Sequence, residues 1–195
     1  MSTVTDNIEI LGGTQMQADK LAIAAGQVSD WLTAGMPNTK PKTVETLLAE
    51  AAGSLYATYD GHAVGHVALK LFPEPAEVQV GSNRGSPAYW NMPHYGVESL
   101  VVKPGMTGLG IGKVLVSNVC LLIEQEVSAQ SADVTTADHP IALASALASG
   151  ESKGLFLDHG FHFNPEMEFV APYEGINLNP ALGKAFVSKL FSQHG

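Results

Sequence analysis

The sequence has little positive charge. Lysine and arginine together number 10 against 19 aspartate and glutamate residues, so the formal net charge is −9, and Arg84 is the single arginine. Proteins that bind nucleic acid or anionic membranes depend on lysine and arginine at the phosphates. We therefore expect no nucleic-acid partner and no membrane partner. An acidic chain attracts a cationic small molecule or a basic peptide more readily.

Cysteine and long apolar runs are also scarce. Cys120 is the single cysteine, which excludes an intrachain disulfide and a cysteine-based zinc site, and we expect no bound metal. No apolar run approaches the ~20 residues that span a bilayer, and the first residues lack the basic region of a signal peptide. These absences favour the cytoplasm. With 195 residues and 45% hydrophobic content, the chain is expected to fold as one domain, residues 1–195.

The first two-thirds of the chain carry clear secondary-structure patterns. Apolar spacing predicts helices over residues 16–32, 43–52 and 112–126, and Thr43 suits the N-cap of the second. Residues 54–59 and 62–71 are strand-like and are joined by Asp60-Gly61, a pair that favours a tight hairpin turn. Further strands are expected at residues 7–11 and 95–102. The chain is therefore predicted to be mixed α/β.

The other segments have weaker patterns. Residues 72–93 contain four prolines and are expected to form a long irregular segment. Strands are expected at residues 133–137 and 161–170. Residues 140–159 are rich in alanine and leucine and are expected to be helical, as are residues 180–194, within a C-terminal helical tail of residues 173–195.

The most informative segment is a glycine-rich turn. It reads Val102-Lys-Pro-Gly-Met-Thr-Gly-Leu-Gly-Ile-Gly-Lys-Val-Leu115, so that a predicted strand runs through glycines into a helix. Free N–H groups and the helix dipole at such a helix start bind anions, and glycines let the backbone approach the ligand. The segment is not a P-loop, because Val114 follows Gly112-Lys113 where that motif has serine or threonine. The dinucleotide-binding fingerprint fails as well, because the turn lies in the middle of the chain.

The turn resembles the acyl-CoA loop of the GCN5-related N-acetyltransferase (GNAT) superfamily. In that family a strand ending Val-x-Pro is followed by Arg or Gln-x-x-Gly-x-Gly or Ala, with Leu three residues further on. The matching positions here are Val102, Pro104, Gly110, Gly112 and Leu115, whereas Thr107 replaces the Arg or Gln. The order of predicted elements over residues 7–170 also agrees with the family.

The resemblance implies a fold and a cofactor. The fold would be the GNAT fold, a central mixed, mostly antiparallel sheet with a splayed cofactor strand and helices on both faces. The cofactor would be acetyl-CoA as acyl donor, its pantetheine bonded to the main chain of Leu100, Val101 and Val102. The expected pyrophosphate contacts are the backbone amides of the turn, at Thr107, Gly108, Leu109, Gly110, Ile111, Gly112 and Lys113.

The resemblance also suggests catalytic groups. The acceptor amine must lose a proton before it attacks the thioester. Glu98 is the first candidate for this base, because family members often carry a catalytic glutamate there, and alternation would place it on one face with Leu100 and Val102. His94, expected in a loop before the strand, is the second candidate. The family's usual acid, a tyrosine, falls at Phe156, which leaves solvent, Ser152 or Tyr173 as proton donor.

Two functions therefore remain open. One is direct acetyl transfer from CoA to a primary amine of a small cationic molecule or peptide. The alternative is a non-catalytic GNAT-fold module that binds CoA or another protein, which the replacements at Thr107 and Phe156 favour. A homodimer is compatible with the low charge density. Cys120, among apolar residues of a predicted helix, is expected to be a buried structural thiol.

Overall fold

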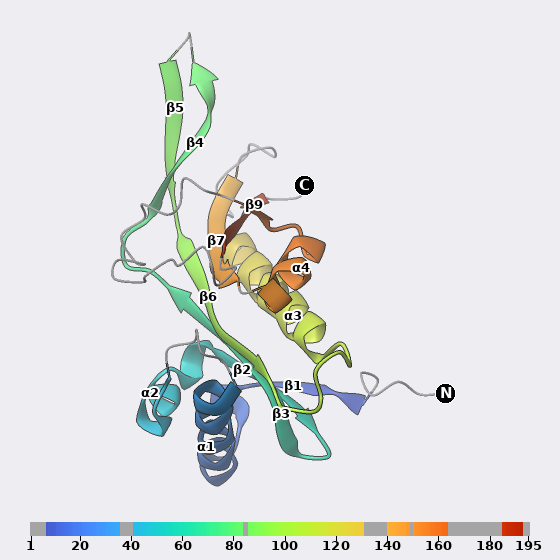
Figure 1. Ribbon diagram of the computed structural model, residues 1–195. Coiled ribbons are helices and arrows are strands. Elements are labelled where there is room, and N and C mark those ends of the chain that lie inside the picture. Colours follow the sequence, from blue (N-terminus) through green and yellow to red (C-terminus); the bar gives the residue numbers. More distant parts are fainter. Residues whose placement is uncertain are drawn as a thin grey trace. The chain divides into compact units, whose positions relative to one another are not determined.

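The computed structural model describes residues 7–35, 41–83, 86–130, 140–148, 150–163 and 185–192. The chain divides into two compact units (Figure 1). The first unit comprises Met1–Leu69 and Val97–Val119, and the second comprises Lys70–Gly96 and Cys120–Gly195. Two strands and one helix contribute residues to both units, namely β3 (His62–Leu71), β6 (His94–Val102) and α3 (Ile111–Gln130).

The first unit contains the helices and strands that the N-terminal half of the sequence predicted, together with two short 3-10 helices (η) that it did not predict. They are β1 (Glu9–Gly12), η2 (Gly13–Gln15), α1 (Ala18–Gly35), α2 (Val44–Ala49), η3 (Ala51–Gly53) and β2 (Ser54–Tyr59). The strand order is β1-β2-β3-β6, with β1–β2 and β2–β3 antiparallel. The Thr43 hydroxyl accepts a hydrogen bond from the Thr46 amide at 3.3 Å, which confirms the predicted cap. Asp60 and Gly61 have φ of 50° and 73°, as a tight hairpin turn requires.

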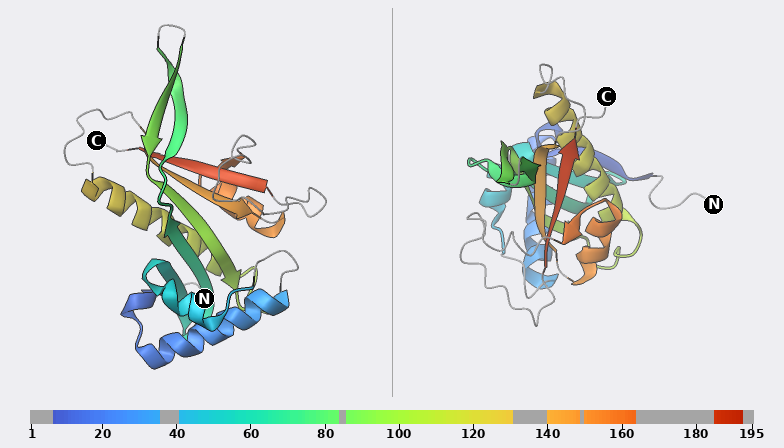
Figure 2. Two further views of the ribbon diagram at one scale, coloured as in Figure 1. Left: turned by 90° about the vertical axis from the view of Figure 1, so that its left-hand side faces the viewer. Right: turned by 90° about the horizontal axis from the view of Figure 1, so that it is seen from above.

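The core of the first unit lies under α1. The buried face of this helix is the one that apolar spacing predicted, and it packs with α2 and the sheet (Figure 2). The buried members of this cluster are Ala24, Ala25, Val28, Leu32, Leu47, Tyr56, Ala63 and Val101. Because Val101 belongs to β6, this core fixes the end of the strand that leads into the glycine-rich turn.

The second unit contains the remaining strands. They are β4 (Ala76–Asn83), β5 (Ser86–Met92), β7 (Pro140–Ala148), β8 (His162–Phe163) and β9 (Ala185–Ser192), together with helix α4 (Gly150–Asp158). The strand order is β6-β7-β9-β8, and β4 with β5 forms a separate antiparallel pair. β9 pairs antiparallel with both β7 and β8, and β7 and β9 lie side by side in Figure 2. The predicted fold class is confirmed: the chain is mixed α/β with a central, mostly antiparallel sheet.

The expectation of an irregular segment at residues 72–93 is wrong. This segment forms the β4–β5 hairpin, with Ala76 opposite Met92 and Asn83 opposite Ser86. Of its four prolines, Pro87 alone lies within a strand. Proline is tolerated there because each strand of a two-stranded pair has a free edge that needs no ladder hydrogen bond.

Two helix predictions in the second half are also wrong. Residues 140–148 form β7 instead of the first part of a helix, and α4 covers Gly150–Asp158. Ala142, Ala144 and Ala146 are fully or almost fully buried in β7, so tertiary packing overrides the intrinsic helix preference of alanine. The expected terminal helix at 180–194 is a strand over Ala185–Ser192, so the tail is not helical there.

Other expectations fall wholly or partly outside the residues that the structure describes. The strand expected at 133–137 is one, and the strand expected at 161–170 is described only as far as β8, His162–Phe163. Tyr173 also lies outside the described residues. Among the described helices, none combines the length and the apolar character needed to cross a membrane.

Candidate functional site

The glycine-rich turn follows β6 directly in the first unit. The Lys103 amide donates to the carbonyl of Val64 on β3 at 2.9 Å, and the Met106 amide donates to the Lys103 carbonyl at 3.0 Å. Gly105, Gly108 and Gly110 then have φ of 83°, 80° and 84°. A residue with a Cβ is strained in this left-handed region, so these glycines permit a backbone path that other residues disfavour.

The turn delivers free amides at the start of α3. The first hydrogen bond of the helix runs from the Val114 amide to the Gly110 carbonyl at 3.1 Å. The amides of Ile111, Gly112 and Lys113 therefore precede the bonding of the helix and have no acceptor within it. Thr107, Gly108, Leu109 and Lys113 are exposed. Amides without a helical acceptor, at the positive end of a helix 20 residues long and beside exposed residues, suit an anion such as pyrophosphate.

The base of this turn is anchored in the core. Ile111 is 1% exposed and Leu115 is fully buried, and both pack over Gly65 of β3. A Cβ on Gly65 would lie 2.9 Å from Cγ2 of Ile111 and 3.0 Å from Cδ1 of Leu115. Ile111 thus serves packing, and the exposed residues of the turn include its neighbours Thr107, Gly108, Leu109 and Lys113. The fit of the turn to pyrophosphate rests on main chain held by this packing.

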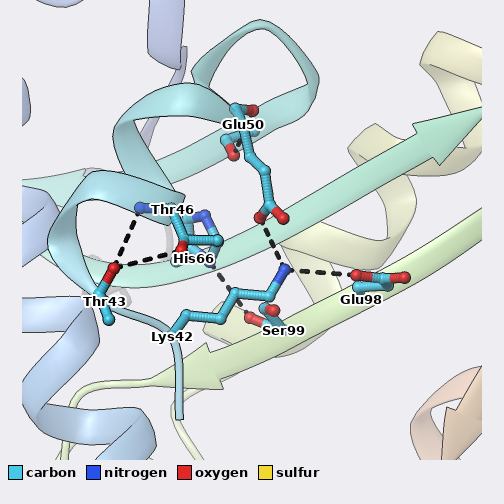
Figure 3. A network of polar contacts seen from close by, with 8 residues as sticks. Lys42, Thr43, Thr46, Glu50, His66, Glu98 and Ser99 are labelled. Carbon is cyan, nitrogen blue, oxygen red and sulfur yellow. Dashed lines mark hydrogen bonds and ion pairs between the residues drawn. The ribbon is translucent and has the colours of Figure 1, made fainter. Parts of the chain in front are cut away.

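Glu98 belongs to a three-residue ionic network, shown in Figure 3. The Lys42 ammonium lies 2.6 Å from Oε2 of Glu50 and 3.3 Å from Oε2 of Glu98. The lysine side chain is 14% exposed, whereas the two carboxylates are about one-third exposed, at 36% and 31%. The network therefore holds one cation between two anions and carries a net charge of −1. Glu98 is fixed in place and remains accessible to solvent.

The strand is irregular immediately after Glu98. Ser99 has φ of 54°, so alternation between the two faces of a regular strand does not carry across it. Regular alternation therefore cannot be used to place Glu98 on one face with Leu100 and Val102, contrary to the expectation from the sequence. Nδ1 of His66 on β3 lies 3.2 Å from the carbonyl oxygen of Ser99. Burial lowers the pKa of His66 to about 4, so the ring is neutral at pH 7.

His94 lies in the second unit and is not in a loop, contrary to expectation. It is the first residue of β6 and is 1% exposed. Nε2 of His94 and the hydroxyl oxygen of Ser145 on β7 form a hydrogen bond of 2.6 Å, and the ring packs against Phe72 with centroids 4.6 Å apart. Burial lowers the pKa of His94 to about 4. These contacts give the ring a packing role in this unit.

The second unit also holds Phe156, the acid candidate Ser152 and the thiol of Cys120. Phe156 is 2% exposed and packs edge-on against Phe161, with ring centroids 5.1 Å apart. It is a core residue without a hydroxyl. Ser152 lies half-buried on α4. Cys120 is buried as expected, and burial raises the pKa of its thiol, which makes it a poor nucleophile.

Sequence reasoning missed three residues that meet at this site. Lys42, Glu50 and His66 come from the segment before α2, the end of α2 and the middle of β3. The available signal was His66, which interrupts an apolar strand between Gly65 and Val67. A polar side chain inside such a strand needs a hydrogen-bonding partner. No local pattern indicates what that partner is.

Comparison with known proteins agrees with this geometry. The family model described as "Acetyltransferase (GNAT) family" matches residues 23–144. No curated protein sequence matches the chain. Among solved structures, N-acetylglutamate synthase from Neisseria gonorrhoeae, complexed with coenzyme A and N-acetyl-glutamate, is 15% identical with a TM-score of 0.60. The alignment covers 94% of this chain but 35% of that protein, so the chain spans about a third of its length.

Two other solved structures match over nearly their whole length. Arabidopsis thaliana Naa50, in complex with the bisubstrate analogue CoA-Ac-MVNAL, is 17% identical, with 95% of this chain and 99% of that chain covered and a TM-score of 0.56. Rv2747 from Mycobacterium tuberculosis, in complex with CoA and NLQ, is 16% identical, with 87% and 95% covered and a TM-score of 0.57. At these sequence identities, similarity to the solved structures shows the fold alone. The family itself is shown by the family model, which covers more than half of the chain. The chain belongs to the GNAT acetyltransferase family.

Proposed function

We propose that this chain is an acetyl-CoA-dependent N-acetyltransferase that moves the acetyl group directly from CoA to a primary amine of a small cationic molecule or peptide. The observation that carries the proposal is the turn between β6 and α3. Gly105, Gly108 and Gly110 adopt positive φ there, and they lead into free amides at the start of a 20-residue helix. Acetyl-CoA is the acyl donor of the family.

The residues of the first unit fit the cofactor. We assign the pyrophosphate to the amides of residues 107–113 and the pantetheine to the main chain of Leu100, Val101 and Val102. Lys113 is exposed in the first turn of α3 and adds a charge-assisted contact. When bound, acetyl-CoA supplies a thioester whose carbonyl carbon is open to an amine. Thr107 contributes its backbone amide, which the replacement of Arg or Gln leaves intact.

Glu98 is assigned the role of base. An alkyl ammonium has a pKa of about 10 and has no lone pair, so it must transfer a proton before it can attack. The Glu98 carboxylate accepts that proton directly or through one water molecule. Lys42 orients the carboxylate through Oε2 at 3.3 Å, which leaves Oε1 for the acceptor. His94 is not used, because Phe72 and Ser145 enclose its ring.

The leaving thiolate needs no acid from the described residues. Phe156 is buried and has no ionisable hydrogen, so it cannot replace the family's tyrosine. A simple thiol has a pKa of about 8.5, close enough to neutrality for water to supply the proton. We therefore assign this proton to solvent. Ser152 and Tyr173 have no part in the proposal.

The acceptor class follows from charge. The chain has a formal net charge of −9, and the Lys42 network has one more carboxylate than cations. Both features favour a cationic amine. Among proteins of similar fold, one is complexed with N-acetyl-glutamate and another with a peptide bisubstrate analogue. We accordingly include amino acids and peptides as acceptors. We further propose one catalytic domain over residues 1–195 that acts in the cytoplasm, alone or as a homodimer.

A thiol-release assay tests the proposal. The protein is incubated with acetyl-CoA and a panel of polyamines, aminoglycosides, amino acids and peptides, and free CoA is followed with a thiol reagent. We expect turnover with at least one cationic amine and its loss in Glu98→Gln. Glu124→Gln removes the same charge from an exposed position on α3 and should keep wild-type turnover. CoA binding with no turnover across the panel would instead support the non-catalytic module.

A further inference from the structure

Ser99 adopts an unusual backbone conformation in the middle of a strand. Its φ of 54° lies in the left-handed region, and Asp60, the other such non-glycine residue in the described part of the chain, sits in a hairpin turn. A residue with a side chain is strained in this region and persists there only when its surroundings hold it. Ser99 separates Glu98, the proposed base, from Leu100, where the proposed pantetheine edge begins.

His66 contacts the carbonyl group of this strained residue. Its Nδ1 lies 3.2 Å from the carbonyl oxygen of Ser99 (Figure 3). A carbonyl can only accept a hydrogen bond, so Nδ1 must carry the hydrogen. The ring is 0% exposed, and burial lowers its pKa to about 4, so at pH 7 it is the neutral Nδ1–H tautomer. The ring of Tyr56 packs against it at a centroid distance of 4.8 Å and restricts its rotation.

Packing alone does not explain a histidine at this position. Nε2 of His66 is buried and has no hydrogen-bonding partner within the described part of the chain. An unpartnered buried polar atom is destabilising, and the neighbours Val64 and Val67 on β3 are buried and apolar. An apolar residue would avoid that penalty. What distinguishes histidine here is the Nδ1–H group that reaches the strained residue on β6.

We propose that His66 is a positioning residue, whose hydrogen bond to the Ser99 carbonyl fixes the left-handed backbone at Ser99 and thereby sets the directions of Glu98 and Leu100. The role in catalysis rests on the proposed function, because that function gives Glu98 and Leu100 their tasks. The effect on the backbone does not rest on it. The two parts can therefore be tested separately.

The backbone part is tested by NMR with two matched variants. Asparagine places an amide N–H near the position of Nδ1, whereas glutamine places it near Nε2, away from the Ser99 carbonyl. The backbone chemical shifts of Ser99 report its φ. We expect positive φ in the wild type and in His66→Asn, and extended φ in His66→Gln. A positive φ in His66→Gln would overturn the inference, whether or not the protein transfers acetyl groups.

The catalytic part is tested by kcat at saturating acetyl-CoA. We expect His66→Asn to retain kcat and His66→Gln to lose about tenfold, the scale of one buried hydrogen bond. Glycine adopts positive φ without strain, so Ser99→Gly added to His66→Gln should restore most of the kcat. If His66 only stabilised the fold, the substitution of Ser99 on β6 would not restore kcat. Extended φ at Ser99 with unchanged kcat would overturn the positioning role while leaving the proposed function standing.

Discussion

Replacing Gly108 by alanine separates binding at the glycine-rich turn from general stability. Gly108 has φ of 80°, and Gly61 in the β2–β3 turn has φ of 73°. An added Cβ would have no atom within 4 Å at either position. The two substitutions therefore introduce the same local strain without a clash. Gly61→Ala is the matched control, because it lies outside the proposed cofactor site.

The expected losses of stability and of CoA affinity follow from the backbone strain and from the hydrogen bonds that the turn amides are proposed to donate. A residue other than glycine in the left-handed region costs about 1–2 kcal/mol, so both variants should lose roughly that free energy of unfolding. The turn in Gly108→Ala can relieve the strain by rotating the adjoining peptide groups, which turns the amides of Gly108 and Leu109 away from the phosphates. Each hydrogen bond to a charged group contributes about 1.5–3 kcal/mol. The Kd for CoA should therefore rise at least about tenfold.

Calorimetric titration with CoA and urea denaturation measure the two effects. We expect similar destabilisation in both variants, with weakened CoA binding in Gly108→Ala alone. Equal Kd values in the two variants, at equal stability, would refute the assignment of pyrophosphate to this turn. Weaker binding in Gly61→Ala alone would move the site to the hairpin.

Three further results are expected. Burial lowers the pKa of His66 and of His94 from 6.5 to about 4, so below pH 6.5 the unfolded chain binds protons that the folded chain does not. The free energy of unfolding, measured in urea, should fall by about 2 kcal/mol per histidine from pH 7 to pH 5. In His94→Gln the fall should be smaller by the contribution of one histidine, about 2 kcal/mol. A free energy of unfolding that does not depend on pH would contradict the burial of these rings. Lys42→Met leaves the carboxylates of Glu50 and Glu98 without their cation and should reduce the free energy of unfolding by about 1 kcal/mol, and by less in high salt. An unchanged midpoint of urea denaturation in low salt would show that the ion pairs do not form. The affinity for CoA should fall less than about threefold between ~0.05 and ~0.2 M salt, because the proposed site binds CoA mainly through main-chain amides, with Lys103 and Lys113 as the cations of the turn. A steep loss of affinity measured by titration would place the site elsewhere.

The elements predicted correctly are those with signals in adjacent residues. The hairpin follows from Asp60-Gly61, and α2 begins at Thr43 because its hydroxyl caps the helix. β7 and β9 were missed because their pairing with each other, from Ala142 opposite Phe191 to Ala148 opposite Ala185, joins segments far apart in the chain. Alanine favours helices locally, and only burial between partners makes it a strand residue here.

The same distinction applies to the candidate site. The glycine-rich turn is contiguous, so its glycines and the following helix could be predicted together. The ion pair between Lys42 and Glu98 joins residues 56 positions apart, and the bond between His66 and Ser99 spans 33 positions. Neither follows from periodicity or spacing. The irregular backbone at Ser99 was unpredictable for a further reason, because serine has no intrinsic preference for positive φ.

An NMR titration of the isotope-labelled protein with CoA tests the central claim most directly. The claim is that the main chain between β6 and α3 binds the cofactor. We expect the largest changes in amide chemical shift at residues 107–113 and smaller ones at Leu100, Val101 and Val102, with little change at Gly61 in the hairpin turn. Saturable binding that leaves the amides of residues 107–113 unshifted would contradict the account.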